Sequence, residues 1–397
     1  MIQPKQFSPD VKRFIAQHKD DDALTLLLKY RTIEGVPMSD IADQLIGRKK
    51  ARIKLPAYAS NEDVLYPPAI NIEQTSSEET AKYKSDVLSA TCDSGNLVDL
   101  TGGFGIDTFA FAQRFNTVVH VEPDKALQQL AEYNHGLLGA SNIRYVNATA
   151  EDYLSSASKA SAVFIDPSRR NATKKVHSFH DCLPDITALQ NRIMDITEVL
   201  LVKASPMHDI QLALREIDQV KRVLVVAADN EVRELLLLVV RGFEGEALIS
   251  AVNLSASHPF VFDFYTSDEQ RSDVEYSQAL SYVYEPHVSL LKVGAFKLIA
   301  KRFGMHKLHV NTQLYTADKL VHDFPGRIFE VRAAIRADEK SAKISFPEGK
   351  ANVIVRNYPA TPEQLKKKLK LKDGGEDYLL AFTDQEGQKL LAVYRCA

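Results

Sequence analysis

The stretch DLTGGFGID combines acidic residues with closely spaced glycines directly after a short apolar segment. Asp99 ends that segment, Gly102, Gly103 and Gly105 follow it, and Asp107 opens the next helical pattern. A glycine-rich turn between a strand and a helix brings backbone N–H groups against a ligand, and the missing Cβ atoms allow close approach. We therefore expect these five residues to hold a cofactor.

A further acidic residue, Glu122, ends the next apolar segment, VVHVE. In this place a carboxylate accepts hydrogen bonds from both hydroxyls of a ribose, so the cofactor contains an adenosine-type group. Both NAD and S-adenosylmethionine suit this geometry. The full G-x-G-x-x-G dinucleotide pattern is absent, and Asp99 and Asp107 beside the loop disfavour a diphosphate. The same two acids suit an ammonium and a sulfonium, which favours S-adenosylmethionine.

Another acidic residue, Asp166, follows the apolar run AVFI in the segment AVFIDPSRR. Asp166 and Pro167 follow an apolar run, and two arginines, Arg169 and Arg170, come directly after them. In an open parallel sheet, ligands bind beside the carboxyl ends of strands where the strand order reverses. Lys203, in LVKASP, follows another apolar run and is expected at the same edge, as a substrate contact, a helix cap or a partner of Asp209.

These groups need a scaffold of alternating strands and helices. We predict helices over most of residues 1–90, including one over 76–88 that Ser76 and Glu79 begin as a capping box. The apolar segments predict an open parallel sheet with helices on both faces. The segments Glu234–Val240 and Ala247–Leu254 predict an antiparallel hairpin that ends the sheet, and the polar residues 266–278 predict a linker. The expected strands of the alternating part are 97–100, 118–121, 143–146, 162–165, 199–202 and 223–226.

Composition limits the class of protein. The 397 residues are enough for two or three domains, and 25% charged residues are normal for a folded chain. The three cysteines form no CxxC pair, so we expect neither a disulfide framework nor a metal site. No signal peptide or membrane span is apparent, which predicts a cytoplasmic protein. A formal net charge of −3 means that any nucleic-acid binding depends on local basic patches.

The glycine loop, Glu122 and the Asp166-Pro167 pair together resemble the class I S-adenosylmethionine-dependent methyltransferases. Asp99 and the glycines match the first motif of that class, and Glu122 matches its ribose-binding acid. Asp166-Pro167 matches the start of its fourth motif, Asn/Asp-Pro-Pro-aromatic, in enzymes that methylate an amine nitrogen. The resemblance implies that the Asp166 side chain and a backbone carbonyl at Pro167 orient the target amine for in-line transfer, so that positioning supplies most of the catalysis.

The match has two departures in the fourth motif. Ser168 replaces the second proline, and Arg169 replaces the aromatic residue that stacks on a base. Arg169 and Arg170 are instead expected to clamp a phosphate or carboxylate near the acceptor, with an ion pair inside the fold as the alternative.

The region that contacts adenine in this class also departs, in NATAED. Thr149 occupies the position where an aspartate is common. We expect Asp152 to take the adenine contact, with Glu151 or backbone amides as alternatives.

The whole chain is similar to a narrower bacterial family, found mainly in Bacteroidetes, of methyltransferases with a C-terminal THUMP-like domain. The segments EQTSSEETAKYKSDVL, DLTGGFGIDTFAFA, FIDPSRR and NTQLYTADKLVHDFPGRIFEV carry this resemblance. It implies a helical region at 1–90, a Rossmann-like domain at 91–265, a ferredoxin-like segment at 279–324 and a small α+β THUMP-like domain at 325–397. THUMP domains accompany RNA-modifying enzymes, so the resemblance implies an RNA substrate, for example tRNA.

Local basic clusters near the C-terminus suit that substrate. KKKLKLK contains Lys367 and Lys368, and RNYP adds Arg356 together with groups that can stack and hydrogen-bond. We expect these three residues to bind RNA, although a lysine-rich helix face can also be simply solvated.

The sequence therefore predicts an S-adenosylmethionine-dependent methyltransferase that acts on a nitrogen of an RNA base. Two alternatives stay open: a methyltransferase for a small molecule or a protein, and a non-catalytic RNA-binding protein that keeps the cofactor fold.

Overall fold

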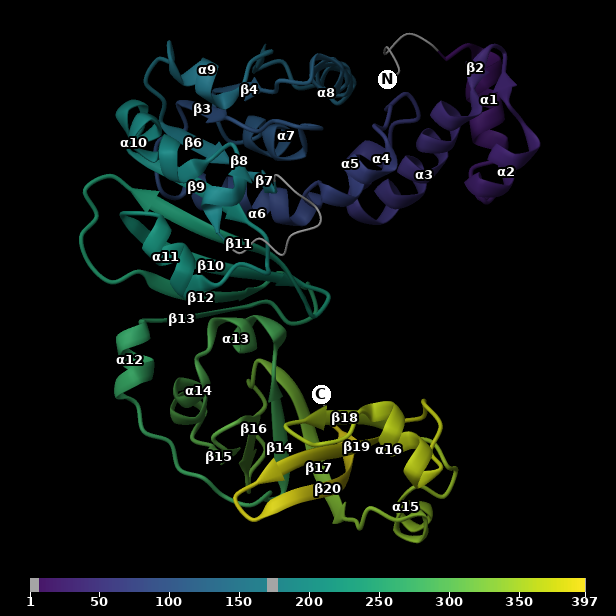
Figure 1. Ribbon diagram of the computed structural model, residues 1–397, viewed down its shortest axis with the longest axis vertical. Coiled ribbons are helices and arrows are strands. Elements are labelled where there is room, and N and C mark those ends of the chain that lie inside the picture. Colours follow the sequence, from purple (N-terminus) through teal and green to yellow (C-terminus); the bar gives the residue numbers. More distant parts are fainter. Residues whose placement is uncertain (1–6, 170–177, 397) are drawn as a thin grey trace. The chain divides into compact units, whose positions relative to one another are not determined.

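The computed structural model describes residues 7–169 and 178–396 and contains two compact units (Figure 1). The first unit comprises Met1–Val223 with Arg233–Gly245, and the second comprises Leu224–Val232 with Glu246–Ala397. Each unit is described by itself below.

The first unit begins with helices, as the sequence predicts. Ser8 caps the first helix by accepting a hydrogen bond from the backbone N–H of Val11. The helices are α1 (Pro9–Gln17), α2 (Ala23–Lys29), α3 (Met38–Lys54), α4 (Pro56–Ala59), α5 (Ala69–Gln74) and α6 (Glu78–Ser89), with a small β1 (Thr32–Ile33) and β2 (Val36–Pro37) hairpin between α2 and α3. The apolar faces of α1, α2 and α3 form one core cluster around Ile15, Leu26 and Ile41.

The predicted parallel strands form the centre of a nine-stranded sheet. Its order is β13-β12-β10-β11-β9-β6-β3-β4-β5. Strands β9, β6, β3, β4 and β5 pair in parallel, and β11 runs antiparallel to β9. The bounds are β3 (Asn96–Asp99), β4 (Thr117–Val121), β5 (Ile143–Val146), β6 (Ala162–Ile165), β9 (Val199–Ala204), β10 (Val220–Ala228), β11 (Glu231–Val240), β12 (Leu248–Asn253) and β13 (Phe260–Phe264).

Helices connect the parallel strands and pack on the sheet (Figure 1). The chain runs outward from β3 through β4 to β5 and then returns to β6 on the other side of β3, so the strand order reverses between β3 and β6. The connecting elements are α7 (Ile106–Ala112), α8 (Lys125–Leu137), α9 (Ala150–Leu154), β7 (Ser168–Arg169), a 3-10 turn (Phe179–Asp181), β8 (Cys182–Leu183), α10 (Ile186–Ile196) and α11 (Ile210–Glu216).

Two local predictions are wrong. The strand order places β10 rather than β12 next to β11, so 234–240 and 247–254 do not form the predicted hairpin. The residues Asp229 and Asn230 connect β10 directly to β11, and both have a positive φ, which short polar side chains tolerate in a tight turn. The predicted linker at 266–278 instead starts with a helix, α12 (Thr266–Arg271), whose Glu269 accepts hydrogen bonds from two backbone N–H groups of another helix.

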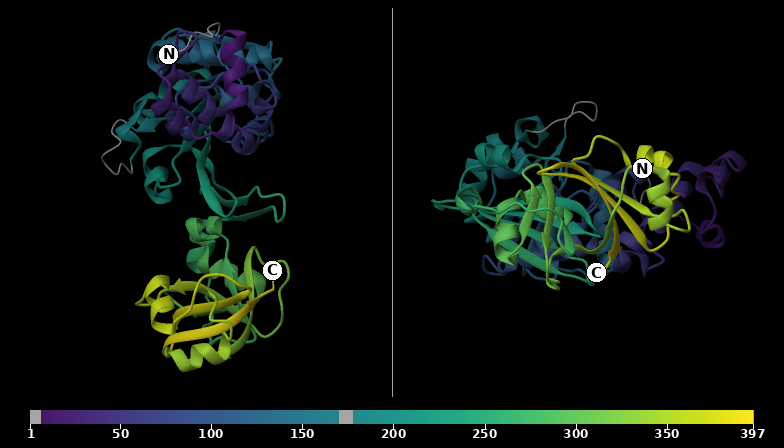
Figure 2. Two further views of the ribbon diagram at one scale, coloured as in Figure 1. Left: turned by 90° about the vertical axis from the view of Figure 1, so that its right-hand side faces the viewer. Right: turned by 90° about the horizontal axis from the view of Figure 1, so that it is seen from below.

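The second unit contains a seven-stranded sheet in the order β15-β16-β14-β17-β20-β19-β18. Its strands come both from the predicted ferredoxin-like segment and from the predicted THUMP-like segment, which therefore share one sheet. Helices α15 and α16 contact each other, and α16 packs on β18 (Figure 1). Figure 2 shows the strands and helices of this unit, in green to yellow, from two further sides. The elements are β14 (Tyr282–Pro286), α13 (Val288–Val293), α14 (Phe296–Phe303), β15 (His306–His309), β16 (Thr312–Ala317), β17 (Gly326–Ala334), α15 (Glu339–Ser345), β18 (Asn352–Arg356), α16 (Pro362–Leu369), β19 (Asp377–Asp384) and β20 (Gly387–Arg395).

Candidate functional site

A cleft of about 470 Å³ lies in the first unit at the carboxyl ends of β3, β4 and β6. The glycine loop, the end of β4, the start of α9 and the residues after β6 line it. Residues Asn71, Thr75 and Ser76 of the N-terminal helical region line it as well. The cleft therefore coincides with the point where the strand order reverses, which is the ligand-binding place in open α/β sheets.

The glycine loop holds the side chain of Glu122 in place. The backbone N–H of Gly103 donates to Glu122 Oε2 at 2.9 Å, and the N–H of Asp124 donates to Oε1 at 2.8 Å. Burial raises the pKa of Glu122, and these two hydrogen bonds oppose that shift. Each carboxylate oxygen keeps a second lone pair for a ligand hydroxyl.

Two histidine rings explain two of the glycines. A Cβ on Gly102 would lie 2.3 Å from the ring of His120, and a Cβ on Gly105 would lie 2.5 Å from the ring of His135. Gly103 and Gly105 have φ of +54° and +86°, a region that glycine occupies at little cost. The histidine rings therefore exclude a side chain at Gly102 and Gly105, whereas at Gly103 only the positive φ favours glycine.

The amide groups of these glycines are already used inside the protein. Gly102 N–H donates to the Val121 carbonyl, Gly103 N–H donates to Glu122, and Gly105 N–H donates to the Gly102 carbonyl. The expectation that these three N–H groups face a ligand is therefore wrong. A diphosphate bound to them would break bonds that shape the loop.

Asp99 lies behind the loop and is not among the residues that line the cleft. Its side chain accepts from the Thr101 N–H at 3.0 Å and from the Thr108 hydroxyl at 2.6 Å. Burial raises the pKa of Asp99 to about 7. Thr101 in turn accepts from the N–H of Asp166 at 2.7 Å through its hydroxyl oxygen. Through Thr101, Asp99 thus links the end of β3 to Asp166, the residue that follows β6.

Asp166 faces the cleft and forms an ion pair with Lys203. Lys203 Nζ lies 2.5 Å from Asp166 Oδ2, and the two side chains are 11% and 34% exposed. Lys203 is the next-to-last residue of β9, which lies beside β6, so parallel strand pairing brings the two residues together. The structure thus places Lys203 at the predicted edge of the sheet, where it pairs with Asp166.

A second lysine lies beneath the same edge. Lys84 of α6 is fully buried, and its Nζ lies 2.6 Å from both carboxylate oxygens of Glu234 and 3.1 Å from Asp107 Oδ1. Ser76 donates to Asp107 Oδ2 at 2.7 Å. The predicted cap of α6 is therefore wrong by one residue, because Ser77 caps the helix and Ser76 contacts Asp107 instead.

The cleft has an acidic lining. Four carboxylates line it, and within the described ranges, 7–169 and 178–396, no lysine, arginine or histidine belongs to the lining. Asp107 pairs with Lys84 and Asp166 pairs with Lys203, so Glu122 and Glu151 supply the net negative charge that favours a cation over a diphosphate. The lining acids are Asp107, Glu122, Glu151 and Asp166.

Four further predicted residues are not among the described residues that line the cleft. Asp152 is not among the lining residues, whereas Thr149 and Glu151 of the same turn are. Arg169 pairs in β7 with Cys182 of β8, and Arg170 lies outside the described residues. Pro167 follows Asp166 directly, and Ser168 lines the cleft and donates to the Leu183 carbonyl at 3.2 Å.

Sequence reasoning missed Lys84 and Glu234, although each leaves a signal. Lys84 shares a helical face with the buried Ala81 and Leu88, and an unpaired lysine is costly on such a face. Glu234 opens the apolar run that ends at Val240. The partner of each is 150 positions away, so the sequence alone does not show that they meet.

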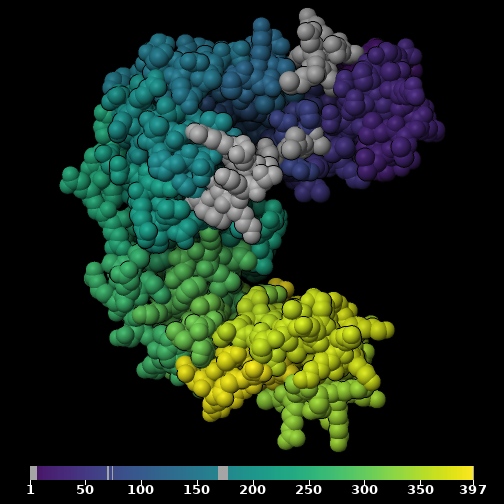
Figure 3. All heavy atoms as spheres, in the orientation of Figure 1, coloured from purple at the N-terminus to yellow at the C-terminus, as the bar shows by residue number. Residues whose placement is uncertain are grey.

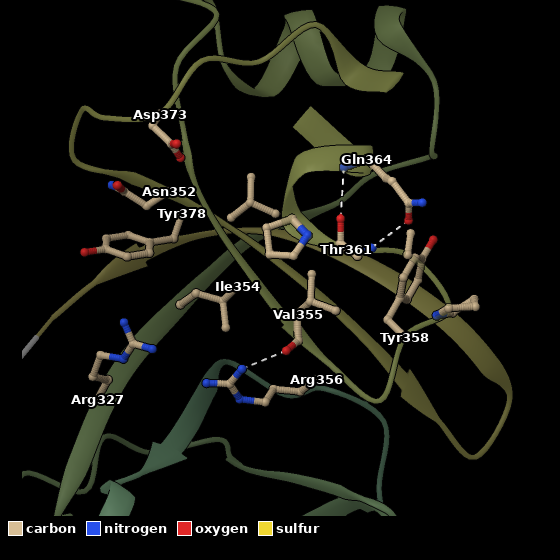
Figure 4. Close-up of a pocket in the computed structure, with 14 residues that line it drawn as sticks. Arg327, Asn352, Ile354, Val355, Arg356, Tyr358, Thr361, Gln364, Asp373 and Tyr378 are labelled. Carbon is tan, nitrogen blue, oxygen red and sulfur yellow. Dashed lines mark hydrogen bonds between the residues drawn. The ribbon is translucent and has the colours of Figure 1, made fainter. Parts of the chain in front are cut away.

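A separate groove of about 790 Å³ lies in the second unit between β18, the start of α16 and the neighbouring strands (Figure 4). Arg327 and Arg356 line it and share the buried Glu285 as their partner. Arg327 Nε donates to Glu285 Oε2 at 2.6 Å, and Arg356 forms an ion pair with the other oxygen. Tyr358 and Tyr378 also line the groove.

The structure separates the predicted RNA-binding residues into two groups. Arg356 lines the groove, whereas Lys367 and Lys368 are exposed on α16 and do not line it. The first turn of α16 does reach the groove, because Thr361, Pro362 and Gln364 line it. Figure 3 shows this part of the chain, from about residue 326 onward, as a continuous surface in yellow-green and yellow.

The helices of the described residues are each too short or too polar to span a membrane. The same residues contain no group of three or more His, Cys, Asp or Glu side chains with the geometry of a metal site.

The parallel sheet with its antiparallel neighbour and the cleft at the glycine loop define the class I methyltransferase fold. Residues 282–325 match a family of ferredoxin-like domains, and residues 326–395 match a family of THUMP-like domains. A solved structure from Porphyromonas gingivalis W83, described as a "putative methyltransferase", has 30% sequence identity and a TM-score of 0.85, and the match covers 98% of both chains. The chain belongs to this family of class I methyltransferases with a C-terminal THUMP-like domain.

Other solved structures match less of the chain. An rRNA methylase from Streptococcus thermophilus has 16% identity and a TM-score of 0.31, with 40% of this chain and 94% of that chain covered. The magnesium protoporphyrin IX methyltransferase from Synechocystis PCC 6803, solved with bound S-adenosylmethionine, has 12% identity and a TM-score of 0.33, with 60% and 100% covered. No curated protein matches the chain.

Proposed function

We propose that the protein is an S-adenosylmethionine-dependent methyltransferase that acts on RNA. One observation supports this cofactor: an acidic cleft lies where the strand order reverses. In it Glu122 is positioned to bind a ribose, and the N–H groups of the loop glycines are bonded within the protein. When bound there, S-adenosylmethionine supplies a methyl group on a sulfonium. Glu122 would hold the ribose, the acidic lining would attract the cation, and Glu151 or Thr149 would lie nearest the adenine.

An RNA substrate is supported by the second unit. The family to which the chain belongs carries a THUMP-like domain, and the groove at Arg327 and Arg356 offers cations beside two tyrosines. Arginine side chains suit phosphate groups, and aromatic rings suit unstacked bases. The exposed Lys367 and Lys368 add positive charge on α16, next to β18.

The acceptor is a nitrogen of an RNA base in this proposal, placed at Asp166 and the Pro167 carbonyl. Asp166→Ala is expected to keep the affinity for S-adenosylmethionine within a few fold and to abolish turnover. Unchanged turnover in that variant would remove Asp166 from the acceptor site.

The test of the function is transfer of radiolabelled methyl from S-adenosylmethionine to total RNA from a strain that lacks the gene. Protein and metabolite fractions run in parallel. Label in a discrete RNA band supports the proposal. Label only in another fraction removes RNA as the substrate, and no label in any fraction despite cofactor binding favours a binding role.

A further inference from the structure

The ion pair between Asp166 and Lys203 constrains the kind of acceptor that can bind beside it. Asp166 reaches the cleft, and Lys203 Nζ lies 2.5 Å behind its Oδ2. A group that hydrogen-bonds to Asp166 at about 2.8 Å therefore lies within about 5 Å of the ammonium. The hydroxyl of Thr101 fixes the backbone of Asp166, so the carboxylate and the lysine keep this arrangement.

Lys203 keeps its charge because of its neighbours. Its burial lowers the pKa, but the carboxylates of Asp166, Glu234 and Asp107 outweigh that effect and raise it. Lys203 is therefore an ammonium at neutral pH and does not act as a base. The other charged groups that act on the pair are Lys84, which binds Glu234, as well as Lys54 and Asp99.

The Lys203 ammonium favours an acceptor that becomes more negative during transfer over one that becomes more positive. An exocyclic amine keeps its proton while it attacks a methyl sulfonium, so its nitrogen becomes more positive beside Lys203, which is unfavourable. A hydroxyl or an amide-type ring N–H gives up its proton, and its negative charge is stabilised by a nearby cation. Asp166 is the group in contact with Lys203 that can accept that proton.

We propose, on the basis of the proposed function, that the acceptor is an amide-type ring N–H of guanine or uracil, a group that loses its proton during transfer. Lys203 selects such a group over an exocyclic amine because its ammonium, held behind Asp166, stabilises the negative charge that the acceptor gains as its proton leaves. The acceptor atom bonds to the methyl carbon as the carbon–sulfur bond breaks, and the electron pair of that bond stays on sulfur. The acceptor proton passes to Asp166 and then to water.

The first test identifies the product. RNA from a strain that lacks the gene is methylated by the wild-type chain, digested to nucleosides and separated by chromatography with mass detection. We expect 1-methylguanosine or 3-methyluridine, and a 2′-O-methylnucleoside would overturn the inference together with the nitrogen acceptor. Methyl on the exocyclic nitrogen of adenine, cytosine or guanine overturns the inference but leaves the proposed function intact. No methyl in RNA overturns the proposed function, and this inference with it.

The second test asks what Lys203 does. In Lys203→Met, removal of a positive charge about 5 Å from the acceptor is expected to lower kcat at pH 7 by about 10²-fold. The rate should then rise by about tenfold per pH unit toward pH 9, because ionisation of the acceptor by solvent replaces the lost stabilisation, while the wild-type rate stays nearly flat. Calorimetric affinity for S-adenosylmethionine should stay within about threefold, and Lys203→Arg should recover part of the rate.

Two controls keep this test decisive. Lys221→Met removes an exposed lysine of β10 and should match the wild type in every assay. If Lys203→Met does not fold, Lys203→Gln, which can still donate a hydrogen bond to Asp166 but carries no charge, replaces it, and its rate should also rise with pH. A Lys203→Met enzyme with the wild-type rate, or with an equal loss at every pH, overturns the role given to Lys203.

Discussion

Replacement of Gly102 by alanine tests whether the histidine behind the loop sets the position of Glu122. A Cβ there would lie 2.3 Å from His120, where ordinary contact begins at 3.4 Å. The His120 ring is fully buried, burial lowers its pKa to about 3, and its Nδ1 contacts the Thr108 hydroxyl at 2.9 Å. The ring cannot retreat without breaking that contact, so the loop must move by about 1 Å.

The cost of that movement follows from the contacts involved. Overpacking of a core costs about 1–3 kcal/mol, and loss of the Gly103–Glu122 hydrogen bond adds about 1 kcal/mol. Gly102→Ala should therefore lose about 2–4 kcal/mol in the free energy of unfolding. Gly103→Ala is the matched control, because nothing lies closer than 3.8 Å to its Cβ and only its φ of +54° costs about 1–2 kcal/mol.

Thermal unfolding and calorimetric titration with S-adenosylmethionine measure both effects. For a unit of this size, Gly102→Ala should lower the midpoint of the first transition by about 4–16 °C. It should also weaken S-adenosylmethionine binding at least tenfold, because Glu122 loses its position. Gly103→Ala should shift the midpoint less and keep the affinity within about threefold. Equal behaviour of the two variants would refute the role given to His120.

Three further predictions concern buried charges. Glu122→Gln should weaken S-adenosylmethionine binding about tenfold in calorimetry, because the amide replaces one acceptor oxygen by a donor. The midpoint of thermal unfolding should change little. Unchanged affinity would contradict the ribose contact. The pKa of Asp99 is about 7 in the folded protein against an ordinary 3.8. Between these values the folded chain keeps a proton that the unfolded chain releases. The free energy of unfolding should therefore fall by at most about 4 kcal/mol as the pH rises from 4 to 7. Asp99→Asn should remove that dependence in denaturant titrations at several pH values, and equal slopes would contradict it. Replacement of both Arg327 and Arg356 by methionine should lower the free energy of unfolding of the second unit by about 3–5 kcal/mol, because Glu285 stays buried without its partners. Adding Glu285→Gln should restore much of that stability. A double variant as stable as the wild type would refute the ion-pair role of Glu285.

The sequence predicts the central sheet and the loop well because those features are local. The strands at 143–146 and 162–165 agree residue for residue with β5 and β6. They are short apolar runs between clear helical patterns, and the glycines and Glu122 have fixed places relative to them. The family resemblance, which the comparison with the Porphyromonas gingivalis structure confirms, uses the same local motifs.

The remaining features depend on contacts between distant residues. Lys84 meets Glu234, and Ser76 meets Asp107, only after the N-terminal helices fold against the sheet. The hairpin was wrong because pattern and spacing cannot tell which strand pairs with β11. The shared partner of Arg327 and Arg356 is likewise visible only in the folded second unit.

The measurement that tests the central claim most directly is calorimetric titration of the full chain with S-adenosylmethionine and, separately, with NAD. The acidic cleft, the positioned Glu122 and the occupied loop amides predict saturable binding of S-adenosylmethionine at one site and no measurable binding of NAD. Tight binding of NAD, or no binding of S-adenosylmethionine by a folded protein, would contradict the account of the cleft.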